Sequence, residues 1–488
     1  MSTLLLRDAR LPGSDRPRDV LLRDGRVAAV GVVGSPGGPE VRLDGRWLRP
    51  GLWDEHVHFT QWVKHRGRLD LTGARSAADA VALVAAAGSG DSILYGAGFR
   101  DALWPDLPTR AALDAVAPER PVVLVSGDLH CGWLNSAAGR LLGMELDESG
   151  VLRETEWIAT LHGLSDQDEP DAADYRAAAD DAARRGVVGI VDFENSDNVA
   201  LWPQRVRDGV TALRVEASVW PSRLQAAISD GHRTGDPLDE LGLITVGRLK
   251  IVVDGSLNTR TALCWDPYPG VPVGDPHRCG VQSVPVSQLH DLLLTAHVAG
   301  IAPAVHAIGD RANTQVIDAF ERLGIPGVVE HAQLVRAEDF ARFGALGLVA
   351  SVQPEHALDD RDVADHHWAG RTGRAFAYRS LLDAGAILRL GSDAPVAPLD
   401  PWASLAGAVS RSRDGRDAWH PEQELPIGAA LAAGSRGRVE VARGSVADLI
   451  VLDHDPLAAG PGQLRDMTVA GTLLGGRWTW NTLEGATA

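Results

Sequence analysis

The sequence predicts an α/β fold: a (β/α)₈ barrel, an α/β insertion after its first strand, and a β-sandwich built from both ends of the chain. Two observations support the barrel. From residue 171 onward, strand-like apolar runs alternate with helical segments about every 25 residues, the pattern of βαβ units around a parallel sheet. Eight strands can be counted from PGLWDEHVH onward, which favours a closed, TIM-like barrel over an open doubly wound sheet. The sequence contains neither a G-x-G-x-x-G motif nor a P-loop, which weakens the alternative of a nucleotide-binding fold.

Both ends of the chain consist of short strand-like runs. Residues 1–49 contain TLLLRDARL, DVLLRDGRVAAVG and EVRLDGRWL, with Asp-Gly turns between alternating apolar residues. Residues 436–488 contain GSVADLIVLDHDPL and MTVAGTLLGGRWTW. Because a small β-unit buries little apolar surface alone, we predict that the two ends form one composite β-sandwich. Two unconnected β appendages are the alternative.

The barrel domain is expected to span residues 50–435. Residues 66–165 interrupt its rhythm: a helix is expected at 77–87, followed by a strand that leads through a loop into a helix over PVVLVSGDLHCGWLNSAAGRLLG. We interpret residues 66–165 as an inserted α/β subdomain. Insertions at the mouth of a barrel commonly cover the active site.

Composition and charge narrow the class of protein. A chain of 488 residues is too long for one compact core, so two or more units are expected. The net charge of −18 argues against binding to nucleic acid or to an anionic membrane. No apolar run approaches the roughly 20 residues of a membrane span, and the N-terminus does not resemble a signal peptide. Three widely spaced cysteines suit a reducing compartment, so a cytoplasmic location is predicted.

Metal-ligating residue types recur where the predicted barrel strands end. His56 and His58 lie two residues apart on the first strand, so both imidazoles point to the same side and can reach one ion. Further groups lie on the fourth, fifth, sixth and eighth strands: Lys250, His306, His331 and Asp393. These strand ends converge on one mouth of a barrel. A lone histidine is more often packed in a core, but four histidines and a carboxylate at one mouth predict a site for zinc or a similar divalent ion.

Four motifs, DEHVHF, VHAIGD, VEHAQ and GSDAPV, occur in the order and spacing of the amidohydrolase superfamily, which this chain resembles. Within the superfamily it is most similar to the branch of N-substituted formamide deformylase and related uncharacterised hydrolases. The shared segments are GDLHCGWLNSAAGRLLG, KIVVDGSLNTRTAL, PTRAALDAVAPERPVVL and HAIGDRANTQVIDAF. The resemblance extends over nearly the whole chain.

The resemblance implies a role for each candidate ligand. His56, His58 and Asp393 would hold one metal ion, and His306 and His331 would hold a second. Lys250 would bridge the two ions as a carbamate formed with carbon dioxide. One or two Zn²⁺ ions are expected, although manganese, iron or nickel would also accept these ligands.

Lys250 is one of only two lysines among 47 basic residues. A protonated lysine offers no lone pair to a metal, whereas a carbamate is a carboxylate-like anion. Arginine cannot replace it, because the guanidinium stays charged. Two alternatives stay open: an amine paired with Asp254 or another carboxylate, and a mononuclear site of three histidines and one aspartate.

The leading functional prediction is a metal-dependent hydrolase of carbon–nitrogen bonds other than peptide bonds, acting on linear amides or N-substituted formamides. A bound metal lowers the pKa of water from about 16 toward about 7, which supplies hydroxide at neutral pH. Asp393 would act as general base and then as general acid, delivering the proton to the leaving nitrogen.

Other functions are compatible with the same residues. Mononuclear deaminases of the superfamily place a glutamate three residues after the strand-five histidine. Here Gly309 holds that position and Asp310 follows it, which counts against deamination. Hydrolysis of cyclic amides, lactones or esters, decarboxylation, and a catalytically silent metal-binding protein are further alternatives. A small-molecule substrate is expected; the oligomeric state is open, and a homodimer is compatible with the sequence.

Several polar or aromatic residues are candidates for substrate contacts, although each taken singly fits a structural role. Two lie in the insertion and four lie just beyond barrel strands: His130, Trp133, Asp254, Arg260, Asp310 and Gln353. Asp54 precedes the histidine pair and is a candidate for orienting a ligand. Residues 357–375, which include His366, His367 and Trp368, could form a lid.

Overall fold

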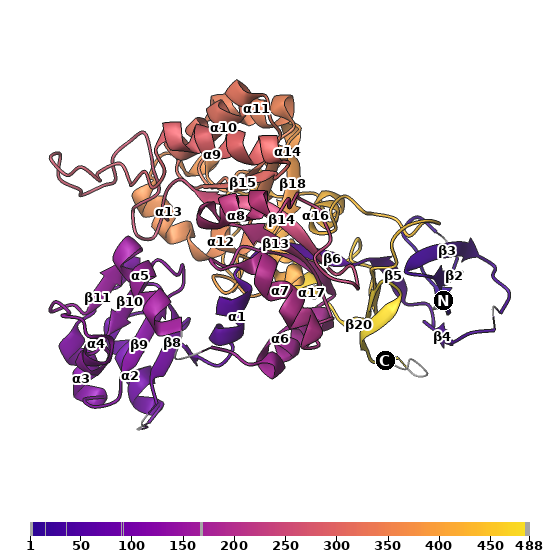
Figure 1. Cartoon of the computed structure of the whole chain (residues 1–488), viewed down its shortest axis with the longest axis horizontal. Helices are drawn as coiled ribbons and strands as arrows, with labels where there is room; N and C mark the ends of the chain where they lie inside the picture. The colour runs from indigo at the N-terminus through magenta and orange to yellow at the C-terminus, as the bar shows by residue number, and fades with distance from the viewer. Residues whose placement is uncertain are drawn as a thin grey trace.

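Eight parallel strands form the centre of the computed structural model, which describes residues 3–14, 16–35, 37–88, 90, 92–165 and 169–483 (Figure 1). In spatial order the strands are β6 (Leu52–Val57), β12 (Val187–Asp192), β13 (Arg214–Val219), β14 (Ile244–Val252), β15 (Pro303–Ala307), β16 (Val328–His331), β17 (Val349–Val352) and β18 (Ile387–Leu390). Each neighbouring pair is parallel. The predicted eight-stranded, TIM-like fold is confirmed.

The barrel closes between β18 and β6, beside the predicted ligands. The Asp393 amide donates to the His56 carbonyl at 2.7 Å, and the His58 amide donates to the Ala394 carbonyl at 2.8 Å. Gly391 is required for this approach, because a Cβ there would lie 2.8 Å from the His56 amide nitrogen. Closure of the barrel therefore fixes the backbone at His56, His58 and Asp393.

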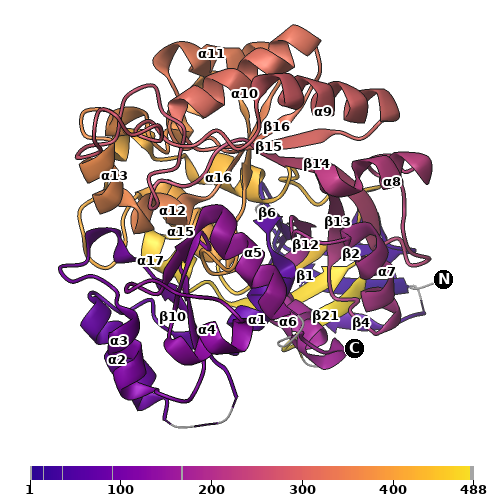
Figure 2. The same cartoon turned by 60° about the vertical axis from the view of Figure 1, so that its left-hand side comes forward.

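Helices surround the parallel strands (Figure 2). Those that follow the strands are α1 (Phe59–His65), α6 (Ala172–Arg184), α7 (Asn198–Arg207), α8 (Leu224–Ser229), α9 (Val286–Ala299), α10 (Asp310–Leu323), α11 (Ala337–Leu346), α14 (Tyr378–Asp383), α15 (Pro401–Ser410) and α16 (Ile427–Gly434). In α10, Val316, Ile317 and Phe320 are buried at helical spacing, so one apolar stripe packs on the barrel. Two short helices, α12 (Pro354–Asp359) and α13 (Arg361–His367), occupy most of the predicted lid segment.

Sheets from the two ends of the chain pack together. One contains β1 (Thr3–Ala9), β2 (Arg18–Arg23), β3 (Arg26–Gly31) and β4 (Glu40–Arg42). The other joins β5 (Trp47–Pro50) to β19 (Leu449–Leu452), β20 (Val469–Leu474) and β21 (Arg477–Asn481), so its strands come from both ends. A short helix, α17 (Pro461–Arg465), lies between β19 and β20. One apolar core contains Leu6, Val20, Leu48, Val451 and Leu473. The expected composite of both termini is therefore present.

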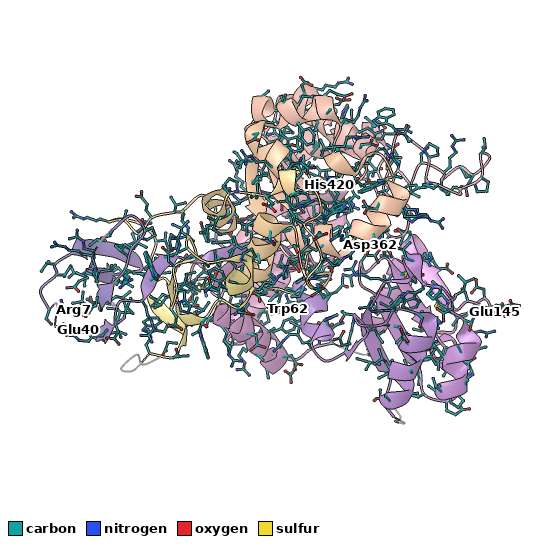
Figure 3. All side chains as sticks on the ribbon, turned by 180° about the vertical axis from the view of Figure 1, so that it is seen from behind. Arg7, Glu40, Trp62, Glu145, Asp362 and His420 are labelled. Carbon is teal, nitrogen blue, oxygen red and sulfur yellow. The ribbon has the colours of Figure 1, made fainter. Side chains whose placement is uncertain are left out.

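The insertion has its own mixed sheet, in the order β11 (Val151–Arg153), β10 (Cys131–Leu134), β9 (Val122–Ser126), β8 (Leu94–Phe99) and β7 (Leu69–Asp70). Its helices are α2 (Ala77–Ala86), α3 (Arg110–Val116), α4 (Ser136–Leu142) and α5 (Glu154–Ser165). The helix expected at 77–87 is present as α2. Where a loop was expected after β9, CGWL forms β10 and pairs antiparallel with β9. Figure 3 shows Glu145 of the insertion and Arg7 of the terminal sheet at opposite ends of the molecule.

The domain limits 1–49, 50–435, 66–165 and 436–488 stay predictions; β5 of the terminal sheet extends one residue past the first limit, to Pro50. Among the helices that the structure describes, none combines the length and apolar character needed to cross a membrane.

Candidate metal centre and active site

A cavity of about 530 Å³ lies where the carboxyl ends of the barrel strands face the insertion. The barrel contributes His56, His58, His306, His331 and Asp393 to its wall. The insertion contributes both apolar and charged or polar side chains: Tyr95, Val123, Val125, Leu129, Ile158 and Leu164, and Arg68, Arg100, Asp128 and His130. The insertion therefore covers the mouth of the barrel, as its position in the sequence predicted.

Three ligand-type side chains meet at the barrel end of this cavity. Ligand atoms of His56, His331 and Asp393 all lie within 4.8 Å of one another. Asp393 Oδ1 is 3.5 Å from His56 Nε2 and 3.2 Å from His58 Nε2. This oxygen is buried and, among the described residues, receives no hydrogen bond of good geometry. A buried oxygen without a donor, surrounded by imidazole nitrogens, fits a divalent cation.

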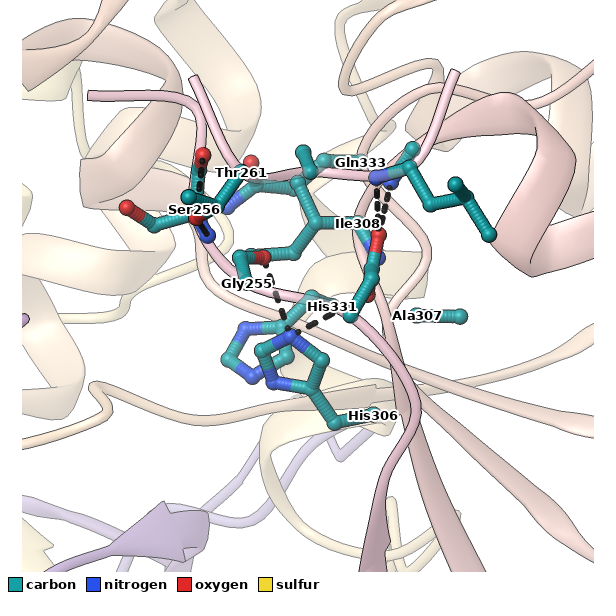
Figure 4. A network of polar contacts seen from close by, with 12 residues as sticks. Gly255, Ser256, Thr261, His306, Ala307, Ile308, His331 and Gln333 are labelled. Atoms are coloured by element: carbon teal, nitrogen blue, oxygen red, sulfur yellow. Dashed lines mark hydrogen bonds and ion pairs between the residues drawn. The ribbon is translucent and has the colours of Figure 1, made fainter. Parts of the chain in front are cut away.

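His306 lies beside the same cluster. Its ring centroid is 4.5 Å from that of His331, and its Nε2 is 3.3 Å from both Asp254 Oδ1 and the Gly255 carbonyl (Figure 4). His331 in turn has Nδ1 2.9 Å from Gln353 Oε1. Because Nδ1 of His331 donates to that amide oxygen, its Nε2 is left for an ion. Asp254 and Gln353, which were candidates for substrate contacts, instead contact the candidate ligands His306 and His331.

Glu330 is a residue that sequence analysis missed. Its Oε2 is 2.7 Å from His56 Nδ1, and both side chains are buried. A carboxylate on Nδ1 orients the ring and leaves Nε2 for the metal. In a regular strand Glu330 and His331 would point to opposite faces, but His331 has a φ of 72°. This left-handed backbone lets two consecutive side chains serve the same site, which an alternation pattern cannot show.

Lys250 is buried among these groups. Its Nζ is 3.0 Å from His56 Nε2 and 4.2 Å from the centroid of the Phe193 ring. Burial lowers the pKa of Lys250 to about 8, against the opposing charges of Glu330 and Asp393. The alternative pairing with Asp254 is not observed: Asp254 accepts hydrogen bonds from the Leu263, Ile308 and Gly309 amides.

The electrostatics favour ionised Asp393 and neutral His56 and His331, whereas for His58 burial alone would lower the pKa but the contact with Asp393 raises it. Burial alone would raise the pKa of Asp393, but the neighbouring His58 and His331 bring it well below its usual range. Burial, followed by neighbouring positive charges, lowers the pKa values of His56 and His331 well below those of ordinary histidines. Neutral imidazoles and a carboxylate anion are the forms that bind metal ions.

Of the four other candidate substrate residues, one lines the cavity and three do not. His130 lines the cavity. Trp133 does not: its ring is buried in the core of the insertion, where Nε1 donates to the Thr109 carbonyl. Arg260 also lies off the wall. The Asp310 carboxylate is engaged by the Trp265 amide and by Arg374, so it supports the loop after β15 and does not reach the cavity.

Two further cavity residues were missed. Glu194 follows β12 and accepts from the Gln61 amide at 2.9 Å. His356, at the start of α12, has its Nε2 3.8 Å from Asp393 Oδ2. Both lie just after barrel strands, so position alone could have indicated them. Asp54, which was expected to orient a ligand, accepts from the His56 and Ser392 amides and joins the two strands that close the barrel.

Several known proteins are similar to this chain in sequence or in structure. The chain is 28% identical to "Protein LONG AFTER FAR-RED 3" of Arabidopsis thaliana over 527 residues, covering 96% of this chain and 86% of that protein. It is 28% identical to N-substituted formamide deformylase of Arthrobacter pascens, covering 76% of this chain and 75% of that enzyme. The structure of an uncharacterised metal-dependent hydrolase from Pyrococcus horikoshii superposes with a TM-score of 0.78 at 25% identity, covering 94% of this chain and 99% of that one.

The family comparison covers the barrel, the insertion and most of the sheet that joins β5 to β19, β20 and β21, but not β1, β2 and β3. The profile of the amidohydrolase family matches residues 40–479. With the fold and the ligand cluster described above, this match shows that the chain belongs to the amidohydrolase family.

Proposed function

We propose that this amidohydrolase is a metal-dependent enzyme that hydrolyses carbon–nitrogen bonds other than peptide bonds, in linear amides and N-substituted formamides. The observation that carries the proposal is the position of Asp393. Its Oδ1 lies within 3.5 Å of His56 and His58, and its Oδ2 lies 4.0 Å from His331. An ionised carboxylate so placed, on the wall of a cavity, can exchange a proton with the reacting groups.

His56, His58 and Asp393 would hold one divalent ion, for which Zn²⁺ suits the ligands, and His306 and His331 would hold a second. Lys250 would join them as a carbamate, because its lowered pKa of about 8 leaves part of the amine neutral and able to react with carbon dioxide. When bound, such an ion polarises a carbonyl group and makes water a stronger acid. Asp393 accepts the proton of the attacking water and returns it to the leaving nitrogen.

The cavity wall supports a substrate with an apolar substituent. Val123, Val125 and Ile158 of the insertion line the same cavity as the candidate barrel ligands. Apolar walls with a few directed polar groups are the usual form of small-molecule sites. Deamination is less well supported, because Gly309 occupies the position of the expected glutamate and the Asp310 carboxylate is engaged elsewhere.

The test uses zinc-loaded protein and a matched panel: N-butylformamide, N-butylacetamide, butyl acetate, 2-piperidone and cytosine. We expect release of butylamine from the linear amides, with loss of that activity after chelation and its return with Zn²⁺. Bound metal with turnover of cytosine alone would favour the deaminase. Bound metal with no turnover of any compound would favour a binding protein.

A further inference from the structure

A polar network lies where the insertion lines the cavity that also contains the candidate metal ligands. His130, on the loop between β9 and β10, has its Nδ1 2.9 Å from Oε2 of Glu154, the first residue of α5. Because Nδ1 donates its proton to this carboxylate, the second ring nitrogen, Nε2, is left for another partner. Within the described part of the chain, no residue hydrogen-bonds to Nε2, and His130 lines the cavity.

The Glu154 carboxylate is fixed from the barrel side. Its Oε1 accepts from the hydroxyl groups of Thr259 at 2.6 Å and Thr261 at 2.7 Å, on the loop after β14. Its backbone amide donates to the His130 carbonyl at 2.9 Å. A Cβ on Gly255 would lie 2.0 Å from the Thr261 hydroxyl, so glycine is needed for this close packing. The insertion and the barrel together therefore hold the carboxylate against His130.

Two residues of this network have strained backbone conformations. Leu129 has a φ of 64° and Glu154 a φ of 48°, in the left-handed region that residues with a Cβ rarely adopt. Such strain persists where surrounding contacts over-determine the conformation, and it is concentrated at functional sites. Here the two strained residues are Leu129, which precedes His130, and Glu154, which binds the His130 ring.

Three carboxylates face His130 from three elements: Asp128 from its own loop, Glu154 from α5 and Asp393 from the barrel. Burial alone would lower the pKa of His130, but Glu154 first, then Asp128 and Asp393, raise it to about 9. The ring is therefore an imidazolium at neutral pH. His130 and Asp393 line the same cavity, which is consistent with the effect of Asp393 on the pKa of His130.

The neighbouring Asp128 does not compete for Nε2. Its oxygens accept from the hydroxyl groups of Ser126 at 2.6 Å and Ser256 at 3.0 Å, and from the His130 backbone amide at 3.1 Å. Nearby, the cation Arg100 is paired with Asp359 and Asp360. Nε2–H of His130 is thus a charged donor that remains for a ligand in this part of the cavity.

We propose that His130 is a catalytic residue supplied by the insertion, donating its Nε2–H to the carbonyl oxygen of the substrate, and that Glu154 is its positioning residue. This inference rests on the proposed function, in which a carbonyl carbon is attacked. As the water oxygen adds, the carbonyl π electrons move onto the carbonyl oxygen, and a fixed cationic donor stabilises that charge more than it stabilises the neutral carbonyl. Loss of one such donor typically lowers kcat about 10²–10³-fold.

The test compares His130→Leu, His130→Gln and Glu154→Gln with His277→Gln, a control on an exposed histidine. With N-butylformamide we expect His130→Leu to lower kcat about 100-fold while KM changes little. His130→Gln should recover part of the loss, because its amide N–H can donate. Metal content should match the wild type. An unchanged kcat in His130→Leu, or a loss that follows metal content, would overturn the proposal.

The pH profile gives a readout that a merely structural role would not move. Above a pH of about 9 the ring loses its Nε2 proton, because Glu154 retains the proton on Nδ1, so kcat should fall. Glu154→Gln should move this fall to lower pH. An alkaline limit that is the same in both proteins would contradict the role of Glu154.

A binding experiment separates this inference from the proposed function. In protein labelled with ¹⁵N-histidine, the His130 signal is identified by its absence in His130→Gln. Added N-butylacetamide or butyl acetate should shift that signal. If no compound of the panel is cleaved but the signal shifts, the proposed function fails and the carbonyl contact stands. If the signal does not move, the contact is refuted, with or without turnover.

Discussion

The two ends of the cavity use the same residue type in opposite ways. At the barrel end, burial lowers the pKa values of His56 and His331 well below normal, so neutral imidazoles offer lone pairs to a cation. At the insertion end, Glu154 and its neighbours overcome burial and raise the pKa of His130 to about 9, so a charged ring offers a proton. The charges around the two rings differ: His56 Nε2 lies 3.0 Å from Lys250 Nζ although Glu330 holds its Nδ1, whereas His130 is faced by the carboxylates of Glu154, Asp128 and Asp393.

The largest effect is expected at the barrel end, from Asp393→Asn. The amide cannot accept a proton from water, so kcat should fall about a thousandfold or more while the fold is retained. Steady-state turnover and circular dichroism check this. Asp362→Asn, on an exposed aspartate, is the control. Undiminished turnover in Asp393→Asn would remove this residue from the mechanism.

Lys250→Arg tests whether the barrel end holds two ions. Arginine keeps the charge but cannot form a carbamate, so metal content should fall from two ions per chain to one or none. Mass spectrometry of dialysed, zinc-loaded protein measures it. Lys64→Arg, at the other lysine, should keep the wild-type content. An unchanged stoichiometry in Lys250→Arg would refute the bridge.

Glu330→Gln tests the carboxylate that orients a metal ligand. The side chain can still bond to His56 Nδ1 but loses its charge, so we expect metal affinity to fall about 10-fold or more. Competition with a chromophoric chelator gives the affinity. Exposed Glu338→Gln is the matched control. Equal affinities in the two variants would show that Glu330 is only a packing partner.

Two glycine substitutions, one at the barrel end of the cavity and one in the insertion, are expected to differ in their effect on metal binding. In Gly391→Ala the new Cβ would lie 2.8 Å from the His56 amide nitrogen, and in Gly132→Ala it would lie 2.2 Å from the Trp157 ring. Each should destabilise the protein by about 1–3 kcal/mol, because a backbone or a buried ring must move. Only Gly391→Ala should also lose metal. Thermal unfolding measures the loss of stability, and metal analysis measures the metal content. An equal loss of metal in Gly132→Ala would contradict this expectation.

The smallest effect is the pH dependence of stability at the insertion end. Because the folded-state pKa of His130 is raised to about 9 from 6.5, its contribution is fully present below pH 6.5 and is lost as the pH rises through 9. The difference in Tm between the wild type and His130→Gln should therefore shrink between pH 7 and pH 10. A constant difference would mean that His130 is not an imidazolium in the folded protein.

The same comparison explains what could be predicted from the sequence. His56, His58, His306, His331 and Asp393 could be predicted to lie together, as they do in one cavity, because metal ligands are few in type and the barrel brings strand ends together. Glu330 was missed because the backbone of His331 departs from strand geometry. The Glu154–His130 pair was missed because it depends on how the insertion docks on Thr259 and Thr261, which no local pattern encodes. Trp133 was placed on the cavity because β10 was taken for a loop, whereas its pairing with β9 turns the ring into the core.

The central claim is that the barrel end binds a divalent cation between His56, His58 and Asp393, with His306 and His331 holding a second. The most direct test is an anomalous difference map at the zinc absorption edge, from crystals of zinc-loaded protein. We predict a peak about 2.0–2.2 Å from ligand atoms of His56, His58 and Asp393, with a second peak beside His306 and His331. A map with no peak within coordination distance of Asp393 would contradict the account.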